Sequence, residues 1–404
     1  MNGWGNFLFC LRIKLNYRDL WIILVMDGVR LFFAGDFCCT PSPSHIEVAE
    51  DLRHLIQSCD VKYVNFEVPL KPEVTLPRQY NARLWQHDDA PGFLRDLGFN
   101  LFSIANNHAF DWGVAGFDKT RRALGDQAFG AGTYEEAYRV KTVEVRGVRI
   151  GFMALTFAAY TGVFDDVQHR DGVGCAYIHD LRVNHDIMEA KKSVDFLFIL
   201  PHDGVEYVDV PLPETIARYR DFIDYGADGV LGSHPHCPQG WEEYNGKPIF
   251  YSLGNFFFNS KETPLYKADK PHWYEGWCVL MEVNPQADKP IQFRIVNTKN
   301  EENRHLIIDD SVDRQRHNEV LQQYLTDKNL YDTYLKSQLE KIAVETEMPI
   351  VMSVRQKLGV IFSIKMSLRS IVHRNSSENG ARFSHLLKND TRLDVLKRYL
   401  KEQK

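Results

Sequence analysis

Three features are missing from this sequence of 404 residues. No stretch approaches the roughly 18 consecutive apolar residues of a membrane-spanning helix. The seven cysteines are odd in number and form no Cys-x-x-Cys pair, which excludes a zinc-finger pattern and a disulfide framework and favours a reducing compartment. Positive charge is not in excess, because the formal net charge is −6. This balance argues against a nucleic-acid binder or a general binder of anionic membranes.

The N-terminal stretch resembles a signal peptide only superficially. Its apolar segment, Trp21 to Met26, is short, and charged side chains interrupt the residues before it. Because Met26 directly precedes the first clear strand, we expect residues 1–26 to be a leader or a misassigned start. We also expect the protein to be cytoplasmic or peripheral to a membrane.

The composition is that of an ordinary soluble globular protein, with 44% apolar and 25% charged residues. A chain of this length has room for one large domain and an appendage. Near residue 300 the pattern changes from short apolar runs to long polar segments. We therefore predict a main domain over residues 27–300 and a helical region over residues 301–404.

Apolar runs alternate with segments of helical spacing. Five strands are predicted, at Val29–Ala34, Val61–Phe66, Phe99–Ala105, Ser193–Leu200 and Gly229–Leu231. Helices are predicted at His45–Ser58, Gly92–Leu97, Val114–Leu124 and Pro213–Tyr225. A hairpin is predicted across Arg146-Gly147, and two later strands, Trp277–Val283 and Ile291–Asn297, suggest a sheet edge. Strands that are apolar throughout indicate an α/β fold whose sheet is covered on both faces.

Polar residues follow each of the five predicted strands. They are Asp36, Glu67, Asn107 with His108, His202, and His234 with His236. Open α/β sheets bind ligands beyond the carboxyl ends of their strands. We therefore expect these side chains to meet in one site.

The stretch from Ala227 to Phe258 is the most informative. His234 and His236 are separated by Pro235, and in an extended segment residues two apart share a face, so both rings can reach one ion. A His-x-His pair alone is more often a surface turn, but here four other strand ends deliver polar residues. Asn255 fits either substrate positioning or turn stabilisation.

Carboxylate, amide oxygen and imidazole are the ligands of hydrolytic centres that use one or two divalent ions, such as Mn, Zn, Fe or Mg. A carboxylate that bridges two ions allows the pair to generate hydroxide and stabilise developing charge. Glu67 is our candidate for the bridge. The predicted metal ligands are Asp36, Glu67, Asn107, His202, His234 and His236.

His108 is predicted to act as a general acid, because an imidazole near neutral pKa can protonate a leaving group. The alternative is a capping or packing role at a helix start. Asn107 and Glu206 complete the predicted catalytic set, Glu206 as a carboxylate that orients an imidazole. Glu242 is a second candidate for that orienting role, and a solvated acid is equally compatible with either position.

Six short motifs resemble those of one known family: Gly35-Asp36, Asn65-Phe66-Glu67, Ala105-Asn106-Asn107-His108 with Asp111 and Gly113, His202 to Glu206, Gly232 to His236, and Tyr251 to Phe256. They extend over Val29 to Asn297, and on them the chain is identified as a member of the bacterial capsule-synthesis CapA family, also called the poly-γ-glutamate (PGA_cap) family. That family resembles the calcineurin-like metallophosphoesterases. The resemblance implies a four-layer α/β/β/α sandwich, here with a C-terminal helical extension, and a two-metal site.

By the same resemblance, Asn107-His108 match the superfamily's Asn-His motif and His202 its isolated histidine. His234 and His236 match its Gly-His-x-His motif.

Three positions depart from the superfamily pattern. Cys38 stands where the first motif, Asp-x-His, has its histidine; a small buried residue is a better interpretation of it than a soft metal ligand. Glu67 replaces a bridging Asp, and Ala109 replaces the acid after Asn-His. Because of these departures, an enzyme with a single metal ion and a scaffold that binds no metal remain as alternatives.

The function implied is that of a capsule or poly-γ-glutamate biosynthesis protein, as a metal-dependent hydrolase of a phosphoester or a γ-glutamyl amide. A non-catalytic, polymer-binding assembly factor on the same fold is the alternative, and a phosphodiesterase unrelated to capsule is a third hypothesis. The implied partners are an anionic polymer or a small-molecule substrate, together with capsule synthesis or export machinery.

The C-terminal region reads as helices at Val312–Lys336, Leu339–Thr346, Val351–Arg374 and Thr391–Lys401. The segment 351–374 is basic and amphipathic, which fits either peripheral contact with a membrane surface or, more often, packing on the protein's own domain.

Overall fold

The computed structural model describes residues 28–73, 84–158, 172–259 and 271–342. The leader over 1–26 and the helices predicted at Val351–Arg374 and Thr391–Lys401 lie outside these ranges. Within the ranges, no helix is both long and apolar enough to cross a bilayer. The six cysteines of the described ranges are all free and buried.

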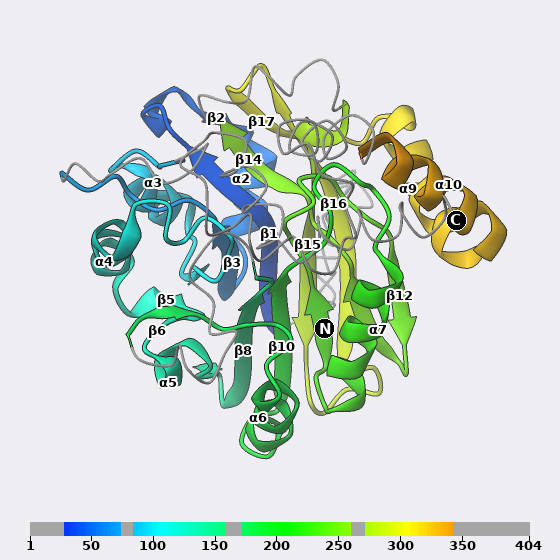
Figure 1. Ribbon diagram of the computed structural model, residues 1–404, viewed down its shortest axis with the longest axis horizontal. Coiled ribbons are helices and arrows are strands. Elements are labelled where there is room, and N and C mark those ends of the chain that lie inside the picture. Colours follow the sequence, from blue (N-terminus) through cyan, green and yellow to red (C-terminus); the bar gives the residue numbers. More distant parts are fainter. Residues whose placement is uncertain (1–27, 74–83, 159–171, 260–270, 343–404) are drawn as a thin grey trace, which may run out of the picture.

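Two β-sheets form the centre of the molecule (Figure 1). The larger sheet has the order β2-β17-β16-β15-β1-β3-β4-β5, with β14 also paired to β1. Its strands are β1 (Val29–Cys39), β2 (Glu47–Val48), β3 (Val61–Phe66), β4 (Leu101–Ser103), β5 (Ala128–Phe129), β14 (Asn255–Asn259), β15 (Glu275–Val283), β16 (Ile291–Glu301) and β17 (His305–Ile308). The strands β14, β1, β3, β4 and β5 run parallel, as the apolar runs predict for β1, β3 and β4.

The smaller sheet has six strands in the order β12-β13-β11-β10-β8-β7. They are β7 (Lys141–Val145), β8 (Val148–Thr156), β10 (Phe196–His202), β11 (Gly229–Leu231), β12 (Trp241–Tyr244) and β13 (Lys247–Phe250). Its four central strands are parallel. Two short strands, β6 (Ala131–Gly132) and β9 (Gly174–Cys175), pair separately.

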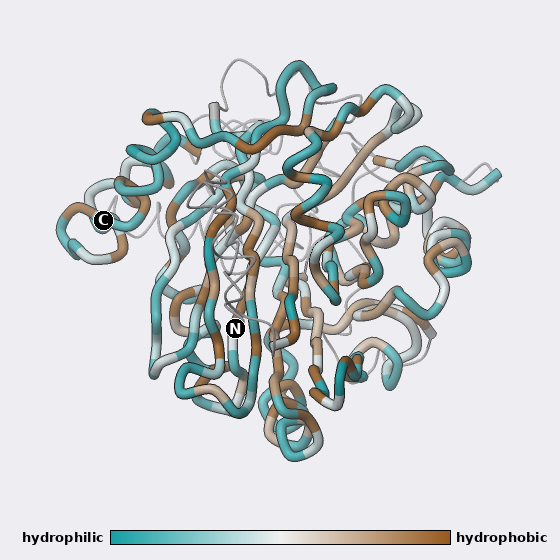
Figure 2. The backbone as a smooth tube through the Cα atoms, turned by 180° about the vertical axis from the view of Figure 1, so that it is seen from behind, coloured by the Kyte–Doolittle hydropathy of each residue, from teal (hydrophilic) through white to brown (hydrophobic). Residues whose placement is uncertain are grey.

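The two sheets pack face to face. Phe33 of β1 contacts Phe198 of β10 and Phe152 of β8, with ring centroids 5.5 and 6.3 Å apart. The next residues along β10, Leu197 and Ile199, point the other way and pack in a separate core, because side chains alternate along a strand. Figure 2 shows brown, hydrophobic segments along the strands.

Helices cover the outer face of each sheet. The second core joins the smaller sheet to α6 (Arg182–Lys191) and α7 (Pro213–Asp224), with α5 (Tyr134–Ala137) beside them. The helices α2 (Glu50–Gln57), α3 (Ala90–Leu97) and α4 (Gly113–Leu124) pack on the larger sheet. The chain therefore forms the four-layer α/β/β/α sandwich that the sequence motifs imply, with a helical extension.

Most predicted elements are present within a few residues of their expected bounds. The hairpin β7–β8 turns at Arg146 and Gly147, whose φ angles are +50° and +80°, as a two-residue hairpin turn requires. The helix predicted over His45–Ser58 is too long, since only Glu50–Gln57 is α-helical. The preceding backbone instead pairs with β17, where Ala49 donates its N–H to Leu306 O at 3.0 Å.

The strand β1 is longer than expected. It was predicted to end at Ala34, but it continues to Cys39 because β14 pairs with its second half. The two parallel pairings of β1, with β14 and β3, shift register next to Asp36, and a bulge of this kind re-aims a side chain. A Cβ on Gly35 would lie 1.8 Å from Gly254 O, so only glycine allows this approach.

The predicted long helix Val312–Lys336 is in fact two helices, α9 (Val312–Thr326) and α10 (Lys328–Ile342). The chain breaks at Asp327, whose Oδ1 accepts from the N–H groups of Asn329 and Leu330 at 2.9 and 3.1 Å, as an N-cap does. Three buried residues of α10 pack on the segment after β10: Tyr331, Leu335 and Leu339.

Candidate metal site

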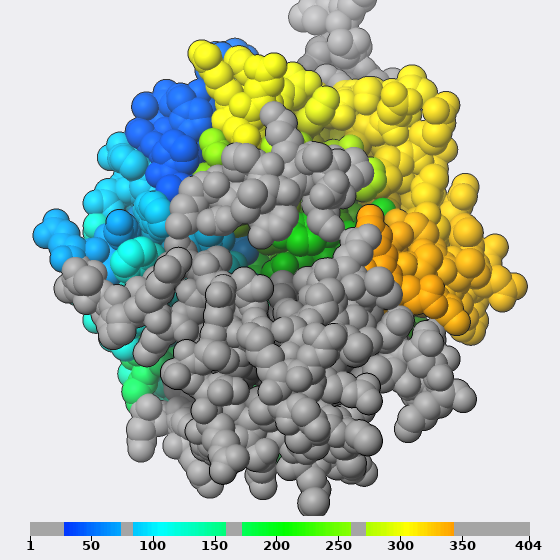
Figure 3. Space-filling view, turned by 45° about the horizontal axis from the view of Figure 1, so that its top comes forward, coloured from blue at the N-terminus to red at the C-terminus, as the bar shows by residue number. Residues whose placement is uncertain are grey.

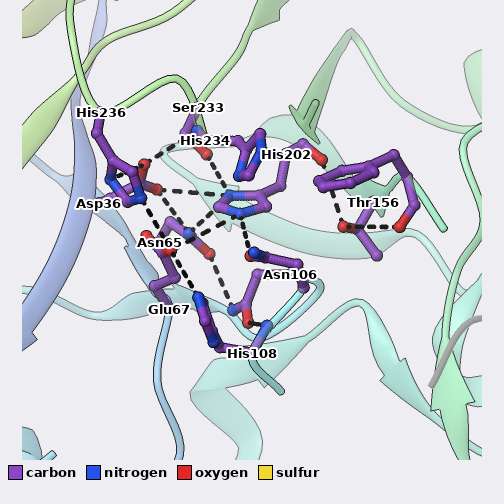
Figure 4. Close-up of polar contacts among 12 residues, drawn as sticks. Asp36, Asn65, Glu67, Asn106, His108, Thr156, His202, Ser233, His234 and His236 are labelled. Atoms are coloured by element: carbon purple, nitrogen blue, oxygen red, sulfur yellow. Dashed lines mark hydrogen bonds and ion pairs between the residues drawn. The ribbon is translucent and has the colours of Figure 1, made fainter. Parts of the chain in front are cut away.

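The polar residues at the carboxyl ends of the strands of both sheets converge on one buried cluster (Figure 4). The larger sheet supplies Asp36 from β1, Glu67 after β3, and Asn107 and His108 after β4. The smaller sheet supplies three histidines: His202 at the end of β10, and His234 and His236 after β11. The sandwich thus places side chains of both sheets opposite one another.

Asp36 is held in the interior by backbone and side-chain donors. Its Oδ1 accepts from Asn65 Nδ2 at 2.7 Å, and its Oδ2 accepts from the N–H of His234 at 2.9 Å. Burial alone would raise the pKa of Asp36, but the nearby imidazoles of His202 and His236 and the hydrogen bond from Asn65 together outweigh it; His202 Nδ1 is 3.5 Å from Oδ1. The pKa of this carboxyl therefore lies well below its ordinary value, and Asp36 is ionised.

Glu67 is fully buried, and neither of its oxygens accepts a hydrogen bond from the described residues. Three imidazole Nε2 atoms surround Oε1: His236 at 3.5 Å, and His108 and His202 at 4.0 Å each. Burial raises the pKa of Glu67 well above its ordinary value, and the charge of Asp36 raises it further. A carboxylate placed in this way needs either a proton or a cation.

His202 lies between the other groups. Its Nε2 is 2.8 Å from Asn107 Oδ1. On the other side of the ring, Nδ1 is 3.1 Å from Asn65 Nδ2 and 3.0 Å from Ser233 Oγ. Because the amide nitrogen of Asn65 can only donate, Nδ1 is an acceptor in this arrangement.

His234 and His236 do not lie in an extended segment, contrary to the prediction. Their φ angles are +101° and +58°, so the chain turns sharply here in a region that non-glycine residues rarely adopt. The ring of His234 packs on His202 and Phe157, with centroids 4.8 and 4.5 Å away, and its buried Nδ1 has no hydrogen-bond partner among the described residues. His236 faces Glu67 instead. The ring centroids of His234 and His236 are 6.0 Å apart.

The pKa values of His234 and His236 both lie below the ordinary value of histidine. Burial is the main cause in each ring. The two imidazoles are therefore neutral near pH 7, which is the form that binds metal ions.

His108 precedes α4 and is oriented by a carboxylate. Its Nδ1 is 2.8 Å from Asp111 Oδ2, and its backbone N–H donates to Asn106 Oδ1 at 3.1 Å. Burial lowers the pKa of His108, but the charge and hydrogen bond of Asp111 outweigh it, so the pKa lies above its ordinary value. Glu206, in a half-buried turn after β10, contributes to the same upward shift.

Glu242 does not orient His236, which corrects the second orienting candidate. It pairs with Arg220 at 2.6 and 2.7 Å and accepts from the Tyr251 hydroxyl. The group that contacts His236 Nδ1 is Asn255, whose Oδ1 is 2.9 Å away. Asn255 therefore orients a histidine rather than only stabilising a turn.

Cys38 lies in a buried apolar cluster with Val68, Leu84, Phe258 and Trp273. Burial raises the pKa of its thiol well above the ordinary value. An uncharged thiol in apolar surroundings is a packing residue and not a metal ligand.

Sequence reasoning assigned no role to Asn65 or Ser233, although both contact His202. The signal for Asn65 was present, because it stands two residues before Glu67 and therefore on the same face of the strand. No comparable signal marked Ser233, since its position depends on the turn between β11 and His234.

The residues present fit a divalent cation. Asp36, Glu67 and His202 each offer a ligand atom, and these atoms lie within 4.8 Å of one another. The unpartnered oxygens of Glu67 and the unpartnered Nδ1 of His234 point to a missing positive charge and a missing ligand contact. Carboxylate, amide oxygen and imidazole suit Zn, Mn or Fe.

Comparison with known proteins links the same part of the chain to capsule synthesis. Residues 30–260 match the family model described as "Bacterial capsule synthesis protein PGA_cap". The "PGA biosynthesis protein CapA" of Bacillus subtilis is 31% identical over 224 residues, which are 52% of this chain and 56% of the relative. The "Capsule biosynthesis protein CapA" of Bacillus anthracis is 27% identical over 246 residues, which are 57% and 58% of the two chains. The match therefore spans less than two thirds of either relative.

Among solved structures, the calcineurin-like phosphoesterase YfkN of Bacillus subtilis is similar over 73% of this chain and 98% of that chain. The sequence identity is 12% and the TM-score is 0.39. A score at this level supports no conclusion about activity, so the assignment of the site depends on the residues described above.

Proposed function

The chain belongs to the bacterial capsule synthesis family PGA_cap, and from this membership we propose that it is a divalent-metal-dependent hydrolase of capsule or poly-γ-glutamate metabolism. The bond cleaved is a phosphoester or a γ-glutamyl amide. The two CapA relatives are named for poly-γ-glutamate and capsule biosynthesis, which supports the choice of pathway. The substrate is accordingly an anionic polymer or a small-molecule precursor of one.

One observation carries the proposal. Glu67 is completely buried, has no hydrogen bond among the described residues, and has three imidazole Nε2 atoms within 4.0 Å of Oε1. A structural acid would be exposed or paired, since an unpaired buried carboxylate destabilises a fold. Its surroundings are explained if Glu67 is a ligand that binds a cation between the two sheets.

The proposed ligands are Asp36, Glu67, Asn107, His202, His234 and His236. The cation is Mn, Zn, Fe or Mg, in one or two copies. When bound, a divalent cation polarises a phosphoryl or carbonyl oxygen and lowers the pKa of a water. Asn255 accepts from His236 Nδ1, which is the usual arrangement around a metal-binding imidazole, and Asn65 holds His202 in position by donating to its Nδ1.

We assign the protonation of the leaving group to His108. Asp111 accepts a hydrogen bond from His108 Nδ1. The other ring nitrogen of His108, Nε2, lies 4.0 Å from Glu67 Oε1, on the side of the cluster where a substrate would be cleaved. The raised pKa favours the protonated form of the ring, which is the form that a general acid requires. Asn107, next in the chain, can donate from its unpartnered Nδ2 to a substrate oxygen, and Glu206 supports the protonated form of His108.

The catalytic domain in this proposal is residues 27–300, with 301–404 as an appended helical region. Capsule synthesis or export machinery is the proposed partner. Segment 351–374 is the proposed place of peripheral membrane contact.

A second candidate function is supported by Cys38. The superfamily pattern has a histidine ligand there, whereas this chain buries an uncharged thiol among apolar side chains. With one ligand fewer, the cluster suits a polymer-binding assembly factor that does not cleave its ligand.

The experiment compares Glu67→Gln with Glu50→Gln, which changes the same side chain at an exposed position of α2. Metal content is measured by mass spectrometry after incubation with Mn, Zn, Fe and Mg. Hydrolysis is measured on nitrophenyl phosphate mono- and diesters and on γ-glutamyl nitroanilide. We expect Glu50→Gln to match the wild type and Glu67→Gln to lose metal and at least about a hundredfold in rate. Bound metal without hydrolysis would favour the assembly factor, and no bound metal in the wild type would refute both the cofactor and the enzyme.

A further inference from the structure

A second cluster of potential metal ligands lies outside the site described above. Asp209 follows β10, His272 belongs to η4 (Pro271–Tyr274), and His317 lies on α9. Each offers one ligand atom, and these atoms lie within 4.8 Å of one another. We propose that these three residues form a second metal site, for Zn2+ or a similar transition-metal ion, which fastens the C-terminal helices to the domain.

The two histidines are oriented by a shared carboxylate. Glu275 Oε2 lies 3.1 Å from His272 Nδ1 and 2.9 Å from His317 Nδ1. The rings stack, with centroids 3.8 Å apart and 17° between their planes. Metal-binding imidazoles commonly donate their other N–H to a carboxylate in this way. The arrangement leaves Nε2 of each ring for an ion.

His317 Nε2 is the atom that most needs a partner. It is buried and makes no hydrogen bond to a described residue. Asp209 Oδ2 is 3.9 Å away, which is too far for a hydrogen bond. In tetrahedral zinc coordination, two ligands that each lie about 2.1 Å from the ion are about 3.4 Å apart, so a small shift of either side chain would bring both atoms onto one ion.

Asp209 is itself held in place by the C-terminal region. The hydroxyl of Tyr334, on α10, donates to Asp209 Oδ1 at 2.7 Å. The other oxygen, Oδ2, is the one that faces His317. The third ligand is therefore oriented in the same manner as the two imidazoles.

The charges around the cluster also fit one divalent ion. Glu275 is paired with the buried Arg314, which occupies the Nδ1 side of the histidines and also donates to Gly276 O at 3.1 Å. Glu275 is thus neutralised and serves as an orienting group. Two imidazoles and one carboxylate, Asp209, remain, and this set binds zinc together with a water.

An ion here would connect three elements that meet beside the first site. Trp273, next to His272, packs against His236 with ring centroids 4.8 Å apart, and its carbonyl accepts from Asn255 Nδ2 at 2.9 Å. In the space-filling view the orange residues of α10 border the green middle part of the chain (Figure 3). The second ion is therefore structural, and it would hold α9 and η4 together at the edge of the first site.

The test is equilibrium dialysis of the full chain against Zn2+, with metal content measured by mass spectrometry. The variant is His272→Gln/His317→Gln. The control is His54→Gln/His185→Gln, which removes two histidines whose side chains are 76% and 68% exposed on helices. We expect the first variant to bind one equivalent fewer than the wild type and the control. Asp209→Asn, which keeps the shape of the side chain, should weaken Zn2+ binding about tenfold or more with an unchanged circular dichroism spectrum.

The second site is separable from the proposed function. His202→Gln/His236→Gln should lose the ions of the first site and keep one equivalent that depends on His317. Equal Zn2+ content in the wild type and in His272→Gln/His317→Gln would overturn the second site and leave the first untouched. The stacked histidines would then be part of an ion-pair network with Glu275, Asp209 and Arg314.

Discussion

Asn255 determines which nitrogen of His236 faces the candidate metal site. Its Nδ2 donates to Trp273 O at 2.9 Å, which fixes the orientation of the amide and leaves Oδ1 2.9 Å from His236 Nδ1. An amide oxygen can only accept, so Nδ1 carries the proton. The unprotonated nitrogen, Nε2, therefore lies 3.5 Å from Glu67 Oε1, in position to bind an ion.

Replacing Asn255 with leucine should weaken metal binding without removing a ligand. The ring of His236 would lose its acceptor at Nδ1, and loss of such a contact costs about 10- to 100-fold in metal affinity. Competition with a chromophoric chelator measures the affinity. Asn245→Leu, in an exposed turn where the side chain contacts Asp224, is the control. Equal affinities in both variants would mean that the ring is positioned by packing alone.

Gly35→Ala should destabilise the protein by about 1–3 kcal/mol or prevent folding, because the added Cβ would collide with Gly254 O at 1.8 Å. Gly92→Ala is the matched control. Gly92 lies on α3 with no atom within 4 Å of a Cβ, so alanine should stabilise that helix by up to about 1 kcal/mol. Urea denaturation followed by circular dichroism gives both values. A tolerated alanine at Gly35 would show that β1 and β14 can move apart.

Glu67 should make the metal-free protein less stable as the pH rises. Its pKa is higher in the folded state than in the unfolded chain, so folding takes up a proton between the two values. The stabilisation is complete below the unfolded pKa, near 4.5, and is lost as the pH rises toward the folded pKa. Urea denaturation in a chelator, at pH 5 and pH 8, should show a steeper loss for the wild type than for Glu67→Gln. Parallel losses in the two proteins would contradict the raised pKa.

Asp111→Asn should shift the pH dependence of hydrolysis. The charge of Asp111 keeps the pKa of His108 above its ordinary value, and a general acid is active only while protonated. Without that charge the alkaline limb of the kcat profile should move to lower pH. His108→Gln should lower kcat by about 10²- to 10⁴-fold at the optimum. An unmoved alkaline limb in Asp111→Asn would assign the leaving-group proton to another residue.

Much of the fold was predictable because the buried strands are marked by apolar runs in the local sequence. The bounds of β3 and β11 match the apolar runs Val61–Phe66 and Gly229–Leu231, since buried parallel strands are apolar on both faces. What failed depended on distant partners. β1 extends past Ala34 because β14 pairs with it, and the helix before Glu50 is lost to a strand that pairs with β17.

The candidate site was predictable as a set of residues and not as a geometry. Strand ends placed Glu67, His202 and Asn107 correctly, because parallel strands bring their carboxyl ends to one edge. The turn at His234 and His236 was not predictable, since its positive φ angles are imposed by contacts such as the hydrogen bond from the His234 N–H to Asp36. The link between Asn255 and His236 depends on the same long-range packing.

The register of β1 and β14 also bears on how the protein is made. Asp36 is aligned with Asn255 in a parallel pair, so two neighbours in the sheet are far apart along the chain. Pairings between such distant segments form slowly. On the ribosome, the second half of β1 must wait as an open strand edge until β14 emerges, and open edges invite association with other chains. Asp36 is therefore synthesised well before Asn255, its neighbour in the sheet, and reaches its final surroundings only after Asn255 has emerged.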